Sequence, residues 1–213
     1  MGYVILGAGG HAKVVIDIIR CMEKIKTDSS PVIQLLDDNL EVGTEINGCL
    51  VVGIIDECHK FINDNKFIIG VGNNHVRRRI AETYLLPYAA AVHPNTVLGS
   101  GVSIGIGSVV MAGVVINCDT HVGRHCIINT GSTVDHENII DDFVHISPGV
   151  HTGGNVRVGK ESWIGIGSCV KNGITLDKSC VVGAGSVVIS NIPEGCVAVG
   201  CPAQVIKCKR NLK

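Results

Sequence analysis

The sequence predicts two domains of different fold class: a small α/β domain over residues 1–85 and an all-β parallel prism over residues 91–192. A C-terminal loop and tail, residues 193–213, follow the prism. The first observation behind this prediction is the alternation of apolar runs with amphipathic stretches in the first domain. The second is a six-residue repeat that continues without a break through the second domain. The third is a composition of 46% hydrophobic but only 3% aromatic residues, which suits an interior filled with Val and Ile.

The first domain alternates predicted strands with predicted helices. Its apolar runs at residues 3–6, 32–36 and 66–71 have the length and composition of buried strands. A helix follows the first run, and its predicted apolar face carries Val14, Val15, Ile18, Ile19 and Met22. Asn73 and Asn74 suit the start of a second helix. This alternation of strand, helix and strand predicts a Rossmann-like parallel sheet.

Two polar segments follow predicted strands of this sheet: the turn GAGGHA, residues 7–12, and the pair Asp37 and Asp38. Ligands of parallel α/β sheets bind at the carboxyl ends of the strands. Backbone N–H groups of a glycine-rich turn before a helix suit a phosphate, and an acidic residue after the second strand suits a ribose or a base edge. The turn departs from GxGxxG at Ala12, so a tight turn without a ligand is the alternative interpretation.

The repeat starts at Ala91, and its 102 residues divide by 6 into 17 sixes such as SIGIGS, WIGIGS and VVGAGS. The second position is Val, Ile or Leu in every six except at Thr152, and the sixth is nearly always small or β-branched. Each six therefore reads as a short strand plus a turn, and three sixes close one triangular coil. Second-position side chains point into the prism and stack on those of the next coil, about 4.7–4.9 Å away. One coil cannot bury its apolar side alone, so stacked coils stabilise one another.

The repeat resembles that of the hexapeptide-repeat acyltransferases, which form a left-handed parallel β-helix. The periodicity alone does not decide the handedness, which comes from the resemblance. Together with GAGGHA, VGNNHVRR at residues 71–78 and AVHPNT at residues 91–96, nearly the whole chain resembles one group of these enzymes. That group contains the sialic acid O-acetyltransferases and the bacillosamine-type N-acetyltransferases of nucleotide-linked amino sugars. The resemblance implies a homotrimer with acetyl-CoA bound between adjacent prisms and no metal ion.

Acetyl transfer from a thioester needs a base for the attacking group and hydrogen-bond donors for the oxyanion. His136 lies in TVDHEN between Asp135 and Glu137, near a corner where side chains reach solvent and a carboxylate can orient the imidazole. One coil further along, 136 + 18 gives Gly154, whose N–H lies about one strand spacing away. The repeat thus places a base beside an oxyanion donor. The resemblance implies the same roles, with His136 as base, Glu137 as its modulator and Gly154 as backbone donor.

The resemblance also implies which residues hold the two substrates. For the nucleotide-linked sugar these are Gly9, Gly10, His11, Asp37 and Asp38, with Asn129 offered by the neighbouring subunit. For acetyl-CoA they are His145 near the acetyl end, Gly154 at the reacting carbonyl, and the backbone of Ile166 and Ala184 along the pantetheine arm.

These features together predict an acetyl-CoA-dependent N-acetyltransferase that acts on the 4-amine of a nucleotide-linked 4-amino-4,6-dideoxy sugar, for a surface polysaccharide or a glycan. The first alternative is O-acetylation of sialic acid or another sugar hydroxyl, for which a nucleotide site is superfluous. A second is a zinc enzyme of the γ-carbonic anhydrase type, with ligands from His121, His125, His145 and His151. A third is a prism without catalytic activity that acts as a scaffold. The sequence names neither the nucleotide nor the stereochemistry of the sugar.

Composition and charge argue against several other classes. The formal net charge of −1 disfavours a nucleic-acid surface, and Arg77–Arg79, the only tight basic run, favours a solvated helix face over a phosphate site. No stretch approaches about 18 uninterrupted apolar residues, and the start of the chain is too short and glycine-rich for a signal peptide. Several of the ten cysteines lie inside the repeat, and we interpret them as reduced, mostly buried thiols of a cytoplasmic protein: Cys118, Cys126, Cys169 and Cys180.

Overall fold

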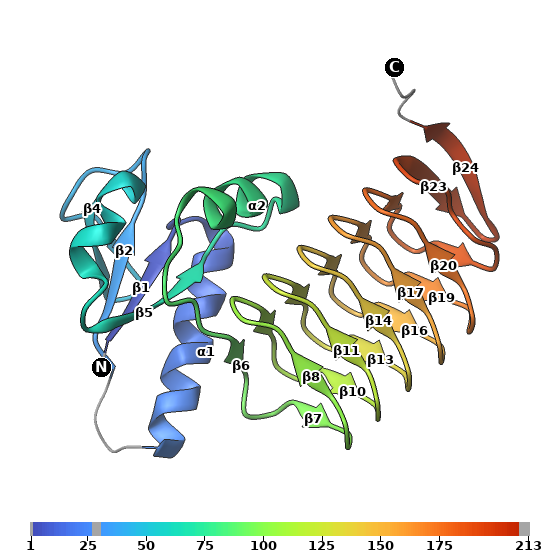
Figure 1. Cartoon of the computed structure of the whole chain (residues 1–213), viewed down its shortest axis with the longest axis horizontal. Coiled ribbons are helices and arrows are strands. Elements are labelled where there is room, and N and C mark those ends of the chain that lie inside the picture. Colours follow the sequence, from blue (N-terminus) through green and yellow to red (C-terminus); the bar gives the residue numbers. More distant parts are fainter. Residues whose placement is uncertain (1, 27–30, 209–213) are drawn as a thin grey trace.

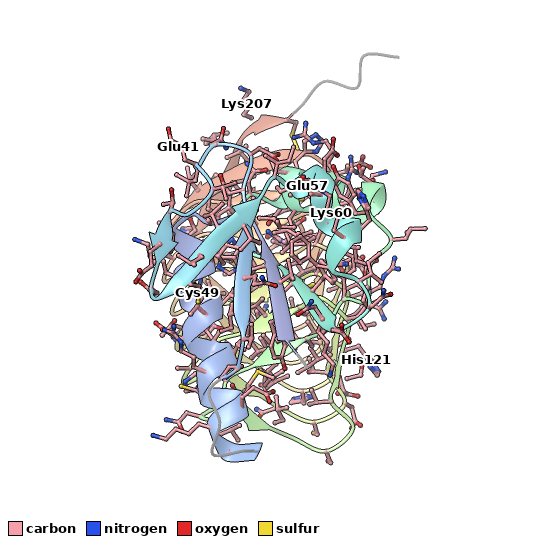
Figure 2. The ribbon with its side chains drawn as sticks, turned by 90° about the vertical axis from the view of Figure 1, so that its left-hand side faces the viewer. Glu41, Cys49, Glu57, Lys60, His121 and Lys207 are labelled. Carbon is pink, nitrogen blue, oxygen red and sulfur yellow. A yellow bond between two sulfur atoms is a disulfide. The ribbon has the colours of Figure 1, made fainter. Side chains whose placement is uncertain are left out.

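The computed structural model describes residues 2–26 and 31–208, and it shows an α/β domain followed by a parallel β-helix. Figure 1 shows the α/β domain at one end of a long prism of stacked coils, with the last strands at the far end. Seen from the first domain, the prism lies behind the sheet (Figure 2). The predicted tail beyond residue 208 lies outside the described residues.

A five-stranded sheet forms the centre of the first domain. Its strands are β1 (Gly2–Leu6), β2 (Ile33–Leu36), β3 (Glu45–Ile46), β4 (Cys49–Gly53) and β5 (Asn65–Ile69). Their order is β3-β4-β2-β1-β5, and neighbours are parallel except for the antiparallel pair β3 and β4. The three strands that the sequence predicts are present as β1, β2 and β5. The short hairpin of β3 and β4 has no counterpart among the predicted elements.

The described part of this domain has three helices: α1 (Gly10–Lys26), the 3-10 helix η1 (Ile55–Phe61) and α2 (Asn74–Thr83). α1 buries Val15 and Ile16 completely, whereas Val14 is 38% exposed, so the predicted apolar face is wrong at one position. Residues three or four apart lie on the same face of a helix, so residue 16 shares the buried face with residues 12 and 19, whereas residue 14 does not. α2 begins as predicted, because the Asn73 side chain accepts a hydrogen bond from the Val76 N–H at 3.0 Å.

The second domain is a prism with three faces, each a sheet built mainly of two-residue parallel strands. Face A consists of β6 (Ala91–Val92), β9 (Val109–Val110), β12 (Ile127–Ile128), β15 (His145–Ile146), β18 (Trp163–Ile164), β21 (Val181–Val182), β23 (Cys196–Gly200) and β24 (Ala203–Cys208). Face B consists of β7 (Val97–Leu98), β10 (Val115–Ile116), β13 (Thr133–Val134), β16 (His151–Thr152), β19 (Cys169–Val170) and β22 (Val187–Val188). Face C consists of β8 (Ser103–Ile104), β11 (His121–Val122), β14 (Ile139–Ile140), β17 (Arg157–Val158) and β20 (Thr175–Leu176).

The register of the prism confirms the predicted coil. Each strand of the repeat pairs with the strand one coil further on, as in Thr133 with His151. All second-position side chains from Val110 to Val188 are buried, Thr152 included. The sixth positions carry buried hydroxyls as well, and these donate to a backbone carbonyl 15 residues further along the chain: Ser108, Thr120, Ser162 and Ser168. Where the sixth position carries such a hydroxyl, a turn carbonyl of the next coil thus finds a donor inside the prism.

The first domain packs on the beginning of face A. Three outward residues of that face, Ala91, Val109 and Ile127, are buried against apolar residues of α1 and the sheet. In Figure 1, α1 lies beside the first coils. The same outward row continues with His145 and Trp163, of which Trp163 stays 48% exposed. The apolar start of the row is thus an interdomain contact, and its later members are available to other molecules.

Arg77 joins the two domains from inside the molecule. It is 1% exposed, and its guanidinium donates at 2.8–3.2 Å to the carbonyl oxygens of Val71 and Gly72 in the first domain and of His125 and Phe143 in the prism. Burial lowers the pKa of Arg77 to about 10, so it stays charged at neutral pH. The prediction of a solvated helix face is therefore wrong for Arg77. Apart from the Asn74 side-chain oxygen at 2.7 Å, its partners are backbone carbonyls that come together only in the fold, and no sequence pattern marks them.

The cysteines depart from the prediction in two respects. Cys126 and Cys180 are buried thiols, but Cys118 and Cys169 are exposed, because they occupy a corner and an outward position of their coils. A disulfide joins Cys196–Cys208 across β23 and β24, outside the repeat. Within the part of the chain that the structure describes, no helix has the length and apolar character needed to cross a membrane.

Candidate active site

His136 lies at the corner between faces B and C, in the turn that joins β13 to β14. Its side chain is half exposed, and its Nδ1 lies 2.9 Å from Glu137 Oε2. When Nδ1–H donates to Glu137, Nε2 is the nitrogen that can accept a proton. Asp135 bonds to the backbone and not to the ring: its Oδ1 accepts the His136 N–H and the Asn117 amide, both at 2.8 Å. The structure therefore pairs the His136 imidazole with Glu137 and leaves Asp135 to hold the turn.

Gly154 lies directly beneath the His136 ring. A Cβ atom at residue 154 would come within 2.5 Å of His136 Cε1 and 2.6 Å of Nε2, so only glycine leaves the ring where it is. The coils are held in register here by the Asn155 N–H, which donates to the His136 carbonyl at 2.9 Å. Among the described residues, the Gly154 N–H has no acceptor. A proton acceptor and an unpaired backbone donor thus lie side by side, which is the arrangement that stabilises an oxyanion next to a base.

A pocket of about 350 Å³ opens at the carboxyl ends of β1 and β2. Gly7, Asp37, Asp38 and Arg79 are among the residues that line it. Asp37 fixes the glycine-rich turn, because its Oδ2 accepts the Ala8 N–H at 2.7 Å. Asp38 Oδ1 accepts a backbone N–H of η1 at 2.9 Å, and its other oxygen has no partner among the described residues. The pocket thus offers a carboxylate acceptor and, from Arg79, a cation that the sequence analysis does not assign to a site.

Apart from Gly7, the glycine-rich turn lies outside this pocket lining, but it leaves room for a ligand. Gly7 has a φ of +95°, and a Cβ there would meet Val71, so the turn requires glycine. A Cβ at Gly9 or Gly10 would meet nothing within 4 Å. Since α1 begins at Gly10, its first N–H groups face this open space, where an anion is favoured.

His11, Asn129 and His145 gather where the first domain meets face A. The Asn129 amide donates to His145 Nε2 at 3.2 Å, and the His145 ring stacks on Trp163 with centroids 5.6 Å apart. Burial, with the charge of Arg77 added, lowers the pKa of His145 to about 3 and that of His11 to about 4. Both imidazoles are therefore neutral at neutral pH. Neither can donate a proton as an imidazolium cation there, whereas both can hydrogen-bond to a substrate.

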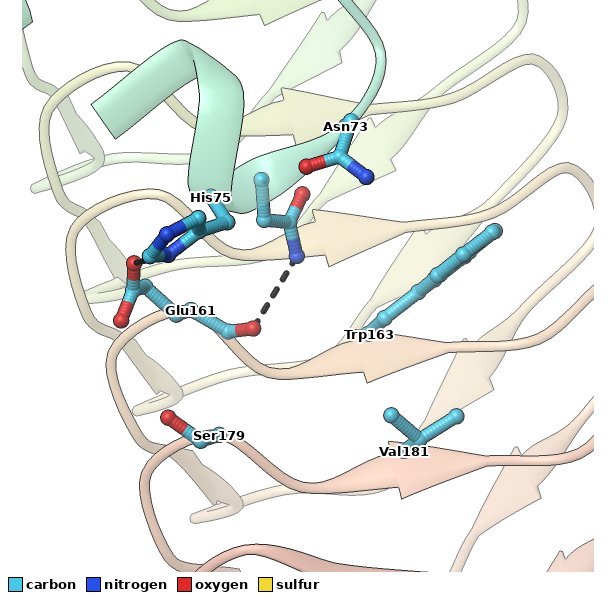
Figure 3. Close-up of a pocket in the computed structure, with 7 residues that line it drawn as sticks. Asn73, His75, Glu161, Trp163, Ser179 and Val181 are labelled. Carbon is cyan, nitrogen blue, oxygen red and sulfur yellow. Dashed lines mark hydrogen bonds and ion pairs between the residues drawn. The ribbon is translucent and has the colours of Figure 1, made fainter. Parts of the chain in front are cut away.

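A second pocket of about 360 Å³ lies beside this cluster, between the start of α2 and face A (Figure 3). Trp163 and Val181 from neighbouring strands form one side of it, and His75 and Glu161 lie together on the other. Asn74 closes it by donating to the carbonyl oxygen of Glu161 at 3.1 Å. The pocket therefore joins an apolar strand face to polar groups of the helix start.

Ile166 and Ala184 occupy equivalent positions on adjacent coils, at the corner between faces A and B. Both are exposed, and their backbone N–H groups have no acceptor within residues 2–26 and 31–208. Two unpaired donors one strand spacing apart suit the amide groups of an extended ligand that runs along the prism.

One chain does not bring all the predicted site residues together. The His136 corner joins faces B and C, and it therefore lies across the prism from face A. Face A carries His145 and Trp163 and supports the first domain. A corner of a triangular prism and the face opposite to it cannot line one pocket. His136 and His145 thus belong to different surfaces of the same chain.

The histidines considered for zinc do not converge. His121 hydrogen-bonds to Ser103 on face C and lies at the edge of the molecule in Figure 2. His125 is buried between Tyr88 and Phe143, with ring centroids 4.6 and 5.3 Å away. No three His, Cys, Asp or Glu side chains of the described chain are grouped so that they could hold a metal ion.

The buried histidines predict a loss of stability in mild acid. Burial lowers the pKa of His125 and His11 to about 4 and that of His145 to about 3, whereas an unfolded histidine titrates near 6.5. Below pH 6.5 the unfolded chain takes up protons that the folded chain does not, so the free energy of unfolding falls as the pH drops toward 4. Thermal melts at neutral pH and at about pH 5 measure this difference. His125→Phe keeps the ring stack and should reduce the pH dependence; an unchanged dependence would contradict the assignment.

The chain is similar to known proteins over nearly its whole length. Residues 3–84 match the family model of the PglD N-terminal domain. The GDP-perosamine N-acetyltransferase of Escherichia coli O157:H7 is 29% identical over 214 residues, with 96% of each chain covered. A perosamine N-acetyltransferase variant from Caulobacter crescentus, solved with CoA and GDP-perosamine, is 32% identical, with 97% of each chain covered and a TM-score of 0.86. The acetyltransferase domain of PglB from Neisseria gonorrhoeae, in complex with acetyl coenzyme A, is 34% identical, with 96% of this chain and 98% of that chain covered and a TM-score of 0.90.

A glycine-rich α/β domain joined to a six-residue-repeat prism defines a class of protein, the hexapeptide-repeat acetyltransferases. The full-length similarity narrows this class. The chain belongs to the family of hexapeptide-repeat sugar acetyltransferases that carry a PglD N-terminal domain. The predicted family and the predicted fold class are thereby confirmed.

Proposed function

We propose that this protein transfers the acetyl group of acetyl-CoA to the 4-amine of a nucleotide-linked 4-amino-4,6-dideoxy sugar. The observation that carries the proposal is the His136 corner, where Nε2 lies over Gly154, the Gly154 N–H is unpaired and Glu137 holds Nδ1. The full-length relatives support the substrate class, since two are named for perosamine N-acetylation and one was solved with acetyl coenzyme A. The cytoplasm, which supplies acetyl-CoA, is the proposed site of the reaction.

In this mechanism the amine attacks the thioester carbonyl while His136 Nε2 takes one of its protons. A C–N bond forms, and the carbonyl oxygen gains negative charge, which the Gly154 N–H stabilises. The C–S bond then breaks, CoA leaves as a thiolate, and the proton on His136 passes to it or to solvent. Glu137 stabilises the imidazolium that exists between these two steps. The reaction needs no covalent enzyme intermediate.

We further propose that the active site is completed by a neighbouring subunit of a homotrimer. The support is the position of His136, which lies across the prism from His145 and Asn129. The proposed base and the two residues at face A therefore lie on different surfaces of one chain. A cyclic trimer repeats one heterologous contact, so the corner of each subunit meets face A of the next. Acetyl-CoA would lie in that contact, with its pantetheine amides on the N–H groups of Ile166 and Ala184. The exposed Trp163 would be buried there too.

The nucleotide would bind in the pocket at β1 and β2. Asp38 has the unpaired carboxylate oxygen to accept N–H groups of a base or hydroxyl groups of a ribose, and Arg79 has the charge to pair with a phosphate. The start of α1, with the open space over Gly9 and Gly10, would hold the rest of the diphosphate. His11, at the same end of α1, would then face the sugar.

Asp38→Asn tests the nucleotide pocket. The amide keeps an oxygen for the backbone N–H of η1 but loses the negative charge, so the fold should persist while the base or ribose binds less well. We expect the Kd of the nucleotide to rise about tenfold, the equivalent of one charge-assisted hydrogen bond. Calorimetric titration measures this, and acetyl-CoA binding in the same preparation is the control. Equal nucleotide affinity in both proteins would place the nucleotide elsewhere.

An acetyl-transfer assay tests the whole proposal. Purified protein is mixed with acetyl-CoA and, separately, with GDP-, UDP- and dTDP-linked 4-amino sugars or free sialic acid, and the release of free CoA thiol is followed. Mass spectrometry then shows which acceptor has gained an acetyl group and on which atom. N-acetylation of one nucleotide-linked sugar is the expected result and names its nucleotide. Acetylation of sialic acid alone would replace the proposal with O-acetylation, and no CoA release with any acceptor would remove the catalytic role.

A further inference from the structure

Two buried polar residues of the prism depart from the pattern of the repeat, and they touch each other. Thr152 is the one second-position residue of the repeat that is not Val, Ile or Leu, and Asn138 is the only amide at a sixth position. They are 5% and 0% exposed, and the Thr152 hydroxyl donates to Asn138 Oδ1 at 3.0 Å. Burying an amide and a hydroxyl is unfavourable unless both are hydrogen-bonded. Their position beneath the His136 corner suggests what they do there.

The Asn138 amide bonds to both turns of the candidate active site. Its Nδ2 lies 2.9 Å from the Asp135 and Gly153 carbonyl oxygens and 3.2 Å from that of His136, so two N–H groups serve three acceptors. The three carbonyl oxygens can only accept, which identifies Nδ2 as the atom that faces them, and Oδ1 then accepts the hydrogen bond from Thr152. One side chain thus holds the backbone under the base and the backbone of the next coil.

The bond to Gly153 acts directly on the Gly154 N–H. The carbonyl of Gly153 and the N–H of Gly154 belong to one peptide group, which is planar and trans, so the two point in opposite directions. Because Asn138 draws the carbonyl into the prism, the N–H is directed outward, at the corner where Gly154 lies beside the His136 ring. A hydrogen bond to the carbonyl also polarises the peptide and strengthens its N–H as a donor.

The regular hydroxyl pattern supplies only part of this bonding. Ser108, Thr120, Ser162 and Ser168 each donate to one carbonyl 15 residues further on, and Asn138 makes that bond to Gly153. A hydroxyl has a single proton to donate, whereas an amide has two and a longer reach. Asn138 therefore adds the carbonyl of His136 to the bond that the repeat already provides.

We propose that Asn138, oriented by Thr152, is a positioning residue for acetyl transfer: it aims and polarises the Gly154 N–H and fixes it relative to His136. This rests on the proposed function of His136 and Gly154. Asn138 itself lies inside the prism and touches no substrate. Its contribution belongs to the transition state, in which the oxyanion exists, and not to the binding of either substrate.

The test uses a matched pair of double variants, Asn138→Val with Thr152→Val and Asn138→Ser with Thr152→Val. Valine already occupies both of these positions in other coils, for example Val110 and Val144, and serine already occupies the sixth position in several coils. The repeat therefore accommodates all of these substitutions, and both proteins should fold. We expect the valine variant to lose kcat by about tenfold to a hundredfold with nearly unchanged KM for both substrates. The serine variant can still reach Gly153 and should recover part of that loss.

Ser108→Ala is the control, because it removes a buried hydroxyl of the same ladder near the start of the prism, away from the His136 corner. It should lower the melting temperature and leave kcat unchanged. The proposal is overturned if the valine variant keeps kcat within about twofold of the wild type, if the two double variants turn over equally, or if the control loses as much kcat as they do. His136→Ala is measured alongside, since full activity in that variant would instead reject the proposed function.

Discussion

Replacing His136 by alanine is expected to reduce the rate of acetyl transfer by about a thousandfold while leaving the fold intact. General-base catalysis contributes about 10²–10⁴-fold, and among the described residues no other histidine lies in the turns that form this corner. The side chain is half exposed and its ring bonds only to the exposed Glu137, so its loss removes little packing. The measurement is kcat with acetyl-CoA and the acceptor found in the assay, together with the melting temperature.

His121→Ala is the matched control for this experiment. His121 is also exposed and also holds one hydrogen bond to a neighbouring side chain, but it lies on face C and away from the corner turns. Its removal should change neither kcat nor the melting temperature by a measurable amount. A His136→Ala protein as active as the control would assign the base to another residue.

Gly154→Ala is expected to lower kcat by about a hundredfold without destabilising the protein. The new Cβ would lie 2.5 Å from His136 Cε1, so the half-exposed ring must rotate away, and misplacing a catalytic group by about 1 Å costs about 10²-fold in rate. Gly154 does not have a positive φ, so alanine fits the backbone and restricts the unfolded chain. Its N–H is retained. The melting temperature should therefore stay the same or rise slightly.

A double-mutant cycle separates this steric effect from damage to the oxyanion donor. In a His136→Ala background there is no ring to displace, so Gly154→Ala should cause almost no additional loss. An equal hundredfold loss in both backgrounds would show that the new methyl group blocks the substrate or the N–H instead. In that case the contact between the ring and Gly154 would not explain the requirement for glycine.

The prism could be predicted almost completely from the sequence because its information is periodic. A coil of three sixes sets which residues stack, and the arithmetic from His136 to Gly154 therefore gives a real contact. In the first domain the main strands and the cap at Asn73 follow from equally local patterns. The predicted apolar face of α1 is wrong at Val14, which is exposed, because helical spacing alone does not decide which of two neighbouring apolar residues faces the core.

The remaining features depend on contacts between segments far apart in the chain. Arg77 lies in a basic run that resembles a solvated helix face, and only the junction of two domains reveals its carbonyl partners. The Cys196–Cys208 bridge depends on a strand pair that lies beyond the repeat. Asn138 and Thr152 are visible in the sequence as exceptions to the six-residue rule. Their mutual contact was nevertheless not predicted, because the repeat predicts how regular residues stack and does not predict which side chains an exceptional residue contacts.

The same limit applies to the candidate site. The His136 corner could be predicted because its parts lie on two successive coils that the repeat keeps in register. Arg79 in the nucleotide pocket could not, since its neighbours come from three separate segments of the first domain. The separation of His136 from His145 follows from which face each six occupies, and this becomes clear once the faces are assigned.

The Arg77 junction bears on how this enzyme tells one sugar from another. The Arg77 guanidinium bonds four carbonyl oxygens from the two domains. It therefore opposes hinge motion between the domains, because separating them would break these hydrogen bonds and leave buried groups without partners. The span from the proposed nucleotide pocket to the prism is therefore set when the chain folds and not when the substrate arrives. A fixed span selects sugars by the distance between their nucleotide and their amine. A sugar whose amine lies too near its nucleotide, or too far from it, reaches the wrong coil however well the nucleotide itself is held.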